Sequence, residues 1–174
     1  MRPMDPNTQC TAFTGTVRLT QGPLWQVAPQ ALAAQALVFD DTTGRIIDLD
    51  PRAWDGTPPP ARRGRPKLGV TAREVTLLPR HWDWLAQQKG GISAALRRLI
   101  DEARRADGGR TAQRQAQEAA YRVMTTLGGD LPGYEEATRA LFAGDLSALA
   151  DRLSAWPDAV RAYVCALAMP KDDT

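Results

Sequence analysis

The sequence lacks the features that define several large classes of proteins. Its 174 residues contain no apolar run approaching the roughly 18 residues that a membrane-spanning helix needs. The first ten residues, MRPMDPNTQC, lack the charged segment and following apolar segment of a secretory signal peptide. We therefore expect a soluble cytoplasmic protein with no membrane partner. Its length suffices for one ordinary core or two small units.

Cysteine and histidine are also scarce. Cys10 and Cys165 lie at opposite ends of the sequence and His81 is the single histidine, so neither a zinc cluster nor a disulfide framework is indicated. A Ser-His-Asp arrangement would have to use His81, whose surroundings are more typical of a partly exposed helix residue. We expect no catalytic residues, no metal and no cofactor, and thus a protein that is not an enzyme.

Four aspartates lie in one short region, and they are the main feature that could indicate a metal site or an enzyme. Asp40, Asp41, Asp48 and Asp50 could hold a hard divalent cation through their carboxylate oxygens. Turn formation and the charging of edge strands explain the same residues without an ion, and we favour that interpretation. An enzyme that uses these aspartates or one of the three tyrosines is a third hypothesis, but no spacing supports it. The tyrosines are Tyr121, Tyr134 and Tyr163.

Positive charge is concentrated in the middle of the chain. Residues 1–60 hold 4 Lys/Arg and 6 Asp/Glu, residues 61–105 hold 11 and 4, and residues 106–174 hold 7 and 10. The three segments therefore carry net charges of −2, +7 and −3. A basic segment between two mildly acidic ones is expected of a polyanion contact, most simply with nucleic acid, although a solvated surface is the alternative.

The pattern along the chain predicts an α+β protein in four parts. Residues 1–56 read as a small N-terminal ββαββ unit, with a weakly helical stretch that Pro29 should interrupt. Residues 57–71 are a Pro/Arg-rich linker or arm. A central segment spans residues 72–106, and residues 107–174 read as a C-terminal helical bundle.

Boundaries within the predicted bundle come from caps and breakers. The first helix should end at Gly128-Gly129 and the second at Gly144. Asp145 should cap the third helix, and Pro157 suits the first turn of the fourth.

The central segment reads as one strand followed by two helices. Val75 and Leu77 alternate with polar residues, and Pro79 should end the strand and begin a helix to about residue 88. Gly90-Gly91 breaks that helix, and Ser93 is the expected N-cap of the next. The second helix has an apolar stripe and an arginine-rich opposite face, where Asp101 and Arg105 are spaced for an ion pair. Trp84 should either pack against a flanking part of the same chain, which we favour, or form an exposed binding patch.

About 35 residues cannot bury enough apolar surface to fold alone, and a lone strand leaves both edges unpaired. Antiparallel pairing with the same strand of a second copy would remedy both defects. The order of parts in VTLLPRHWDWL and GGISAALRRLI resembles the ribbon-helix-helix (MetJ/Arc-type) family of DNA-binding domains. The expected dimer core consists of Val75, Leu77, Trp82, Leu85, Leu96, Leu99 and Ile100.

This resemblance implies a mode of DNA contact. The family places its two-stranded ribbon in the major groove, so the outward residues Ala72, Glu74 and Thr76 would face the bases. It also places the amides at the start of the second helix on a phosphate, which corresponds here to Ser93 and Ala94. This face departs from the usual chemistry, because it has no Arg or Lys to read guanine.

The arm ARRGRPK supplies the positive charge that the ribbon lacks. Its RGRP core resembles an AT-hook, in which Arg63 and Arg65 would enter the narrow minor groove of A·T tracts. A plain basic linker is the alternative. In either case Arg62, Arg63, Arg65 and Lys67 would attract phosphates.

As a whole, the chain resembles an uncharacterised bacterial family of unknown function from about residue 11 to residue 167, through stretches such as GRPKLGVTAREVTLLPRHWDWLA and VFDDTTGRIIDLD. That resemblance implies no activity. The sequence therefore leaves two main hypotheses. The first is a DNA-binding homodimer, such as a transcriptional regulator or antitoxin-like repressor, whose flanking parts bind an effector or a protein partner. The second is a dimeric protein-interaction or scaffold module that does not bind DNA.

Overall fold

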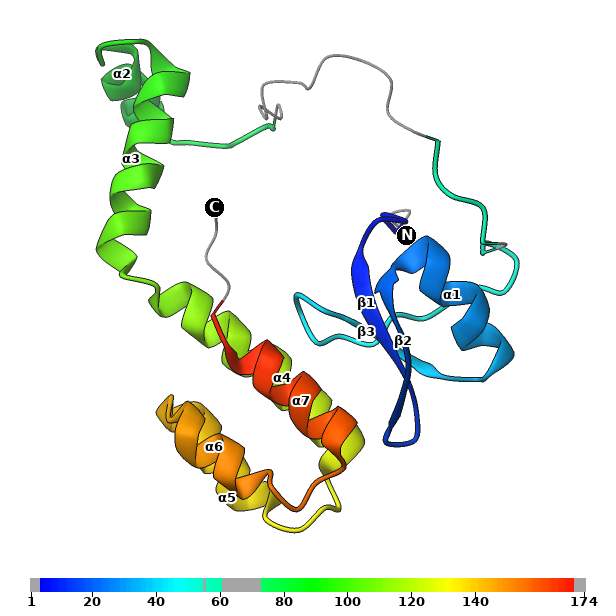
Figure 1. Cartoon of the computed structure of the whole chain (residues 1–174). Helices are drawn as coiled ribbons and strands as arrows, with labels where there is room; N and C mark the ends of the chain where they lie inside the picture. The colour runs from blue at the N-terminus through cyan, green and yellow to red at the C-terminus, as the bar shows by residue number, and fades with distance from the viewer. Residues whose placement is uncertain (1–3, 55, 61–72, 171–174) are drawn as a thin grey trace. The chain divides into compact units, whose positions relative to one another are not determined.

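A computed structural model describes residues 4–54, 56–60 and 73–170 of the chain (Figure 1). Contacts divide the chain into two compact units. The first consists of Met1–Pro60 together with Thr111–Thr174, and the second is Ala61–Arg110. No helix among the described residues has both the length and the apolar composition to cross a membrane.

The first unit begins with a three-stranded antiparallel sheet. β1 (Gln9–Thr14) and β2 (Val17–Pro23) form a hairpin whose turn contains Gly15 at φ 58°. β3 (Leu37–Asp40) pairs with the other edge of β1, which gives the strand order β2-β1-β3. These strands confirm three of the four that the sequence predicted.

The predicted fourth strand does not form. Ile46 makes a single bridge with Phe39, and the Ile47 amide donates to the Val38 carbonyl at 2.8 Å. The chain then turns at Asp50, whose side chain accepts a hydrogen bond from the Arg52 amide at 2.9 Å. Pairing thus ends after one bridge, so the ββαββ prediction is corrected to ββαβ.

The helix α1 (Leu24–Ala33) covers one face of the sheet and runs through Pro29 without interruption, contrary to the prediction. Proline removes one hydrogen bond of the helix. The loss is tolerated because packing of an amphipathic face contributes more to helix stability than any single backbone bond. The buried residues of that face are Leu24, Val27, Ala28 and Ala31.

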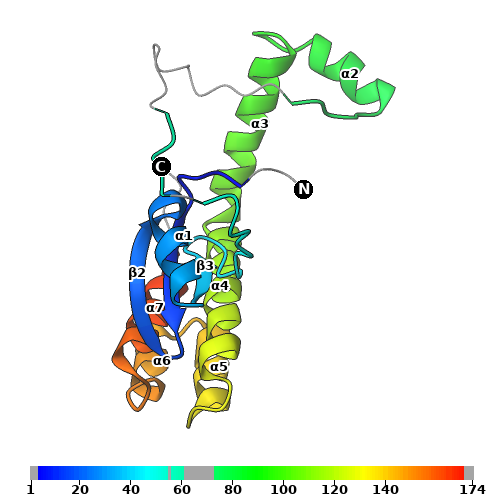
Figure 2. The same ribbon diagram turned by 90° about the vertical axis from the view of Figure 1, so that its right-hand side faces the viewer.

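Four helices complete the first unit: α4 (Arg110–Gly128), α5 (Tyr134–Ala143), α6 (Leu146–Arg152) and α7 (Asp158–Ala168). Their predicted boundaries are confirmed: Gly144 ends α5 at φ 75°, and the Asp145 side chain accepts from the Ala148 amide at 2.9 Å. α5 and α6 pack together near the C-terminal end of α4 (Figures 1 and 2).

The sheet and these helices share one core. Phe13 and Phe39, on the face of the sheet opposite α1, pack with Val123 of α4 and Tyr163 of α7. The ring of Phe13 lies 5.3 Å from that of Tyr163 and 6.1 Å from that of Phe39. The N-terminal strands and C-terminal helices therefore form a single three-layered unit, in which the sheet lies between α1 and the helices.

The second unit contains α2 (Pro79–Ala86) and α3 (Ile92–Asp107). Both helices and the glycine break between them confirm the predicted helix pair. Ser93 is not the N-cap, however. Gly91 at φ 79° precedes the helix, and its carbonyl accepts from the Ala95 amide. Because glycine adopts this conformation without a steric penalty, the helix begins earlier than a serine cap would allow.

Candidate functional site

The second unit exposes much of its apolar surface. Only Leu85 and Ala95 are buried among its described residues. Val75 is 56% exposed, Leu78 49% and Ile100 55%. Soluble proteins rarely leave contiguous apolar surface without a partner, so this surface is a candidate interface.

The lengths of the two helices explain the exposure. α2 has 8 residues and α3 has 16, which correspond to about 12 and 24 Å. α2 lies beside the beginning of α3 (Figure 1) and can cover only that part. Leu99 of the apolar stripe is 37% exposed, and the stripe continues to Ala103, past the length of α2.

The expected dimer core is only partly buried in the single chain. Leu85 is 3% exposed and lies between the helices. The others are half-buried or exposed. Half-buried are Leu77, Trp82 and Leu96, and exposed are Val75, Leu99 and Ile100. Trp84 is 49% exposed, and the packing expected for it against a flanking part of the chain stays a prediction.

Residues 73–78 belong to no strand in the described part of the chain, whose sheet contains β1, β2 and β3 alone. Pairing of this segment with the chain's own sheet would exclude the ribbon. Glu74 and Thr76 are exposed here. The predicted contact residues Arg62, Arg63, Arg65, Lys67 and Ala72 lie outside the described residues.

The start of α3 was predicted to bind a phosphate. Ser93 is exposed and Ala94 half-buried, both in the first turn, whose amides have no carbonyl one turn earlier to bond. Gly91 replaces Ser93 as the residue before the helix, so the amide of Ile92 joins this set.

A buried polar cluster in the first unit was not predicted. Asp41, 8% exposed, follows β3 and points at α7. Its Oδ1 accepts hydrogen bonds from the Thr11 hydroxyl at 2.7 Å and from the Tyr163 hydroxyl at 2.8 Å. Its Oδ2 accepts from Gln21 Nε2 at 3.1 Å. One carboxylate thus joins β1, β2 and α7.

The electrostatics of this cluster favour neutral partners around Asp41. Burial raises the pKa of Tyr163, and the negative charge and hydrogen bond of Asp41 raise it further. Burial, with smaller effects of Asp41 and Asp40, raises the pKa of the Cys10 thiol to about 12. The thiolate is the nucleophilic form, so Cys10 is unreactive near neutral pH. The cluster is therefore suited to holding elements together.

Two of the remaining aspartates, Asp40 and Asp50, form turns, as predicted. The Asp40 carboxylate accepts from the amides of Thr42 and Thr43 at 2.7 and 2.9 Å, and Asp50 accepts from Arg52. Within the described ranges, no group of three His, Cys, Asp or Glu residues is placed to hold a metal ion.

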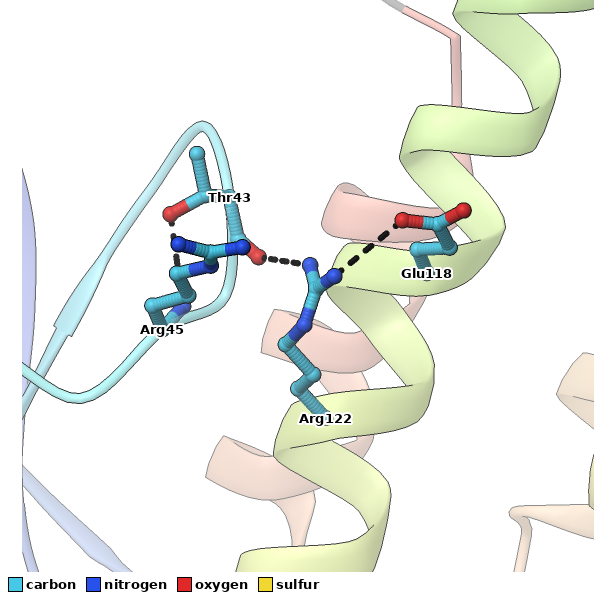
Figure 3. A network of polar contacts seen from close by, with 4 residues as sticks. All are labelled: Thr43, Arg45, Glu118 and Arg122. Carbon is cyan, nitrogen blue, oxygen red and sulfur yellow. Dashed lines mark hydrogen bonds and ion pairs between the residues drawn. The ribbon is translucent and has the colours of Figure 1, made fainter.

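The turn after β3 also docks on α4. Arg122 donates to the Thr43 carbonyl at 2.7 Å and pairs with Glu118 at 3.1 Å (Figure 3). Gly44, at φ 64°, lies directly against the Ala119 backbone, where an added Cβ would overlap the carbonyl oxygen. Gly44 in the motif DDTTG indicated a turn in the sequence. Its contact with Ala119, 75 residues later in the chain, was not indicated by any local sequence pattern.

The model of one protein family, described as an uncharacterized protein conserved in bacteria (DUF2239), matches residues 9–168. This match covers both compact units. No curated protein and no solved structure matches the chain.

Proposed function

We propose that this chain, which belongs to the DUF2239 family of bacterial proteins, is a DNA-binding homodimer. Its second unit would supply both the dimer contact and the DNA contact. A role as a transcriptional regulator or antitoxin-like repressor suits such a protein.

The exposed apolar surface of the second unit supports the dimer most directly. Six large apolar side chains between residues 75 and 100 are at least 36% exposed, on a unit with two buried residues in its described part. A second copy would cover the end of α3 that α2 does not reach. It would also supply the strand partner that residues 73–78 lack within the described chain. The six are Val75, Leu78, Trp84, Ile92, Leu99 and Ile100.

Charge supports DNA as the ligand. Residues 61–110 contain 12 Lys/Arg and 5 Asp/Glu, a net charge of +7, while the rest of the chain carries −5. A ribbon of two copies of residues 72–78 would lie in the major groove. The arm from Arg62 to Lys67 would follow the phosphates or enter an A·T-rich minor groove like an AT-hook.

One observation favours the second candidate, a dimeric scaffold that does not bind DNA. The exposed residues Glu74 and Thr76 present no positive charge, and Glu74 would repel the phosphates. In that case the apolar surface makes the dimer and the basic arm is a linker.

Light scattering and a gel shift on an A·T-rich duplex at 50 mM salt separate these candidates. We expect a dimer that binds DNA and loses affinity steeply as salt increases. The variant L99Q/I100Q should become monomeric, whereas the control V17Q/L19Q, which alters exposed apolar residues of β2, should stay dimeric. A dimer that binds no duplex at 50 mM salt would support the scaffold. A wild-type monomer would exclude both candidates.

A further inference from the structure

The outer face of α3 carries a regular pattern of positive charge. The sequence LRRLIDEARRAD places Arg97 and Arg98 seven residues, or two helical turns, before Arg104 and Arg105. Two turns correspond to about 10.5 Å along the axis. All four side chains are exposed. The four guanidinium groups therefore form a band along the helix.

This band lies opposite the apolar stripe. At about 100° per residue, Leu99 and Ala103 project to one side of α3, and Asp101 projects to the other. The arginines flank Asp101 on both sides, and Asp101, Arg104 and Arg105 line one open surface pocket. The face has four positive charges and two negative charges, from Asp101 and, at its edge, Glu102, so it keeps a net charge of +2.

Two of these charges, those of Arg97 and Arg105, are not neutralised by ion pairs within the described part of the helix. Arg97 and Arg105 stand four residues before and after Asp101, the spacing at which helical ion pairs form. In the part of the chain that the structure describes, neither makes an ion pair. Arg98 makes one long hydrogen bond, 3.5 Å, to Gln88 Oε1. Exposed guanidinium groups of this kind bind phosphate oxygens in two-pronged geometry.

We infer that the arginine face of α3 is a second DNA contact, which binds the phosphate backbone of duplex DNA. The inference rests on the proposed function, because it assigns part of the DNA contact to residues outside the ribbon and the arm. It also accounts for a ribbon face without positive charge. The ribbon and the arm would fix the position of the protein on the duplex, while α3 would add affinity for the DNA phosphate backbone.

The apolar stripe and the arginine face can be used together. A second copy that covers Leu99 and Ala103 leaves the opposite face of α3 open, because the two project in opposite directions. A dimer would therefore present two such faces, one from each copy. Both faces would then add to the salt dependence of binding.

The test compares the dimeric wild-type protein with R97Q/R105Q on one A·T-rich duplex between 50 and 200 mM salt. Each phosphate contact contributes about −0.9 to the slope of log K against log salt. We expect the slope to flatten by about 2 for each copy that contacts DNA, or about a tenfold smaller loss of affinity over this range. The matched control R114Q/R152Q removes two exposed arginines of the first unit, and it should leave the slope unchanged.

The opposite change of charge provides an independent readout. D101N removes the negative charge at the centre of the face without adding a contact. It should tighten binding by about two- to threefold at 50 mM salt while the slope stays nearly constant. A variant that merely damaged the helix would weaken binding instead.

Two negative outcomes are distinguishable. If the wild type binds DNA while R97Q/R105Q and the R114Q/R152Q control both keep its slope, the arginine face is not a DNA contact and the proposed function stands. If the wild type binds no duplex at 50 mM salt, the proposed function fails and the inference fails with it.

Discussion

Replacement of Asp41 should destabilise the first unit more than any other single exchange of an acidic residue. In D41A the hydroxyls of Thr11 and Tyr163 lose their acceptor, and both residues are buried, at 0% and 5% exposure. A buried donor left unsatisfied costs about 1–3 kcal/mol. Two such donors predict a loss of about 3–5 kcal/mol in the free energy of unfolding, a large part of the stability of a small domain.

D41N should have a smaller effect. Its side-chain oxygen can still accept from Thr11 and Tyr163, and its amide can face Gln21, whose exposed side chain can turn to present its own oxygen. We expect a loss of about 1–2 kcal/mol, because neutral hydrogen bonds are weaker than those to a carboxylate. D48A, which alters an exposed aspartate seven residues later, should change the stability by less than about 0.5 kcal/mol.

Urea unfolding followed by tryptophan fluorescence can measure these differences. A W82F/W84F background removes the two tryptophans of the second unit, so the signal then comes from Trp25, Trp54 and Trp156 of the first. A loss below about 1 kcal/mol in D41A would refute the reasoning, since it would mean that the two hydroxyls find other partners.

Three further predictions concern the same unit. G44A should lower the free energy of unfolding by about 3 kcal/mol, because its Cβ would overlap the Ala119 carbonyl; G15A, also at positive φ but with nothing nearby, should cost about 1 kcal/mol in the same urea assay. The raised pKa of Cys10 means that the unfolded thiol ionises first, so stability should fall as pH rises from 9 towards 12. This effect reaches about 4 kcal/mol at most, and in C10A the decline with pH should be shallower. T138V should raise stability by about 1 kcal/mol, because the buried hydroxyl it removes has no hydrogen-bond partner within the described structure; an equally large loss would show that the hydroxyl is satisfied by water.

The parts of the fold that the sequence predicted depend on local interactions. Gly144 ends a helix because glycine adopts a positive φ, and Asp145 begins the next by accepting from an amide three residues later. The stripe of Val160, Val164 and Leu167 in α7 follows from the helical period, and all three residues are buried. Signals of this kind lie within a few residues and need no knowledge of the tertiary fold.

The parts that were missed depend on contacts between distant residues. Asp41 reads as a turn residue, and its partner Tyr163 lies 122 positions later. Pro29 reads as a helix breaker, but the apolar face of α1 packs on the sheet and outweighs the lost bond. The predicted fourth strand does not form: its pairing ends after one bridge at Ile46, although the alternation of apolar and polar residues continues. Neither periodicity nor composition encodes such long-range pairings.

The contacts that close the first unit make the tests on the second unit interpretable. Asp41 with Tyr163, and Arg122 with the Thr43 carbonyl, join residues before position 61 to residues after position 110. The second unit is thus inserted into a unit that has its own core and its own long-range polar contacts. Substitutions in α3 remove none of those contacts. Loss of dimerisation in L99Q/I100Q, or a flattened salt slope in R97Q/R105Q, should therefore occur with the near-ultraviolet spectrum of the first unit unchanged. A concerted loss of that spectrum would show that the two units fold together, and the effects on binding would then be consequences of unfolding.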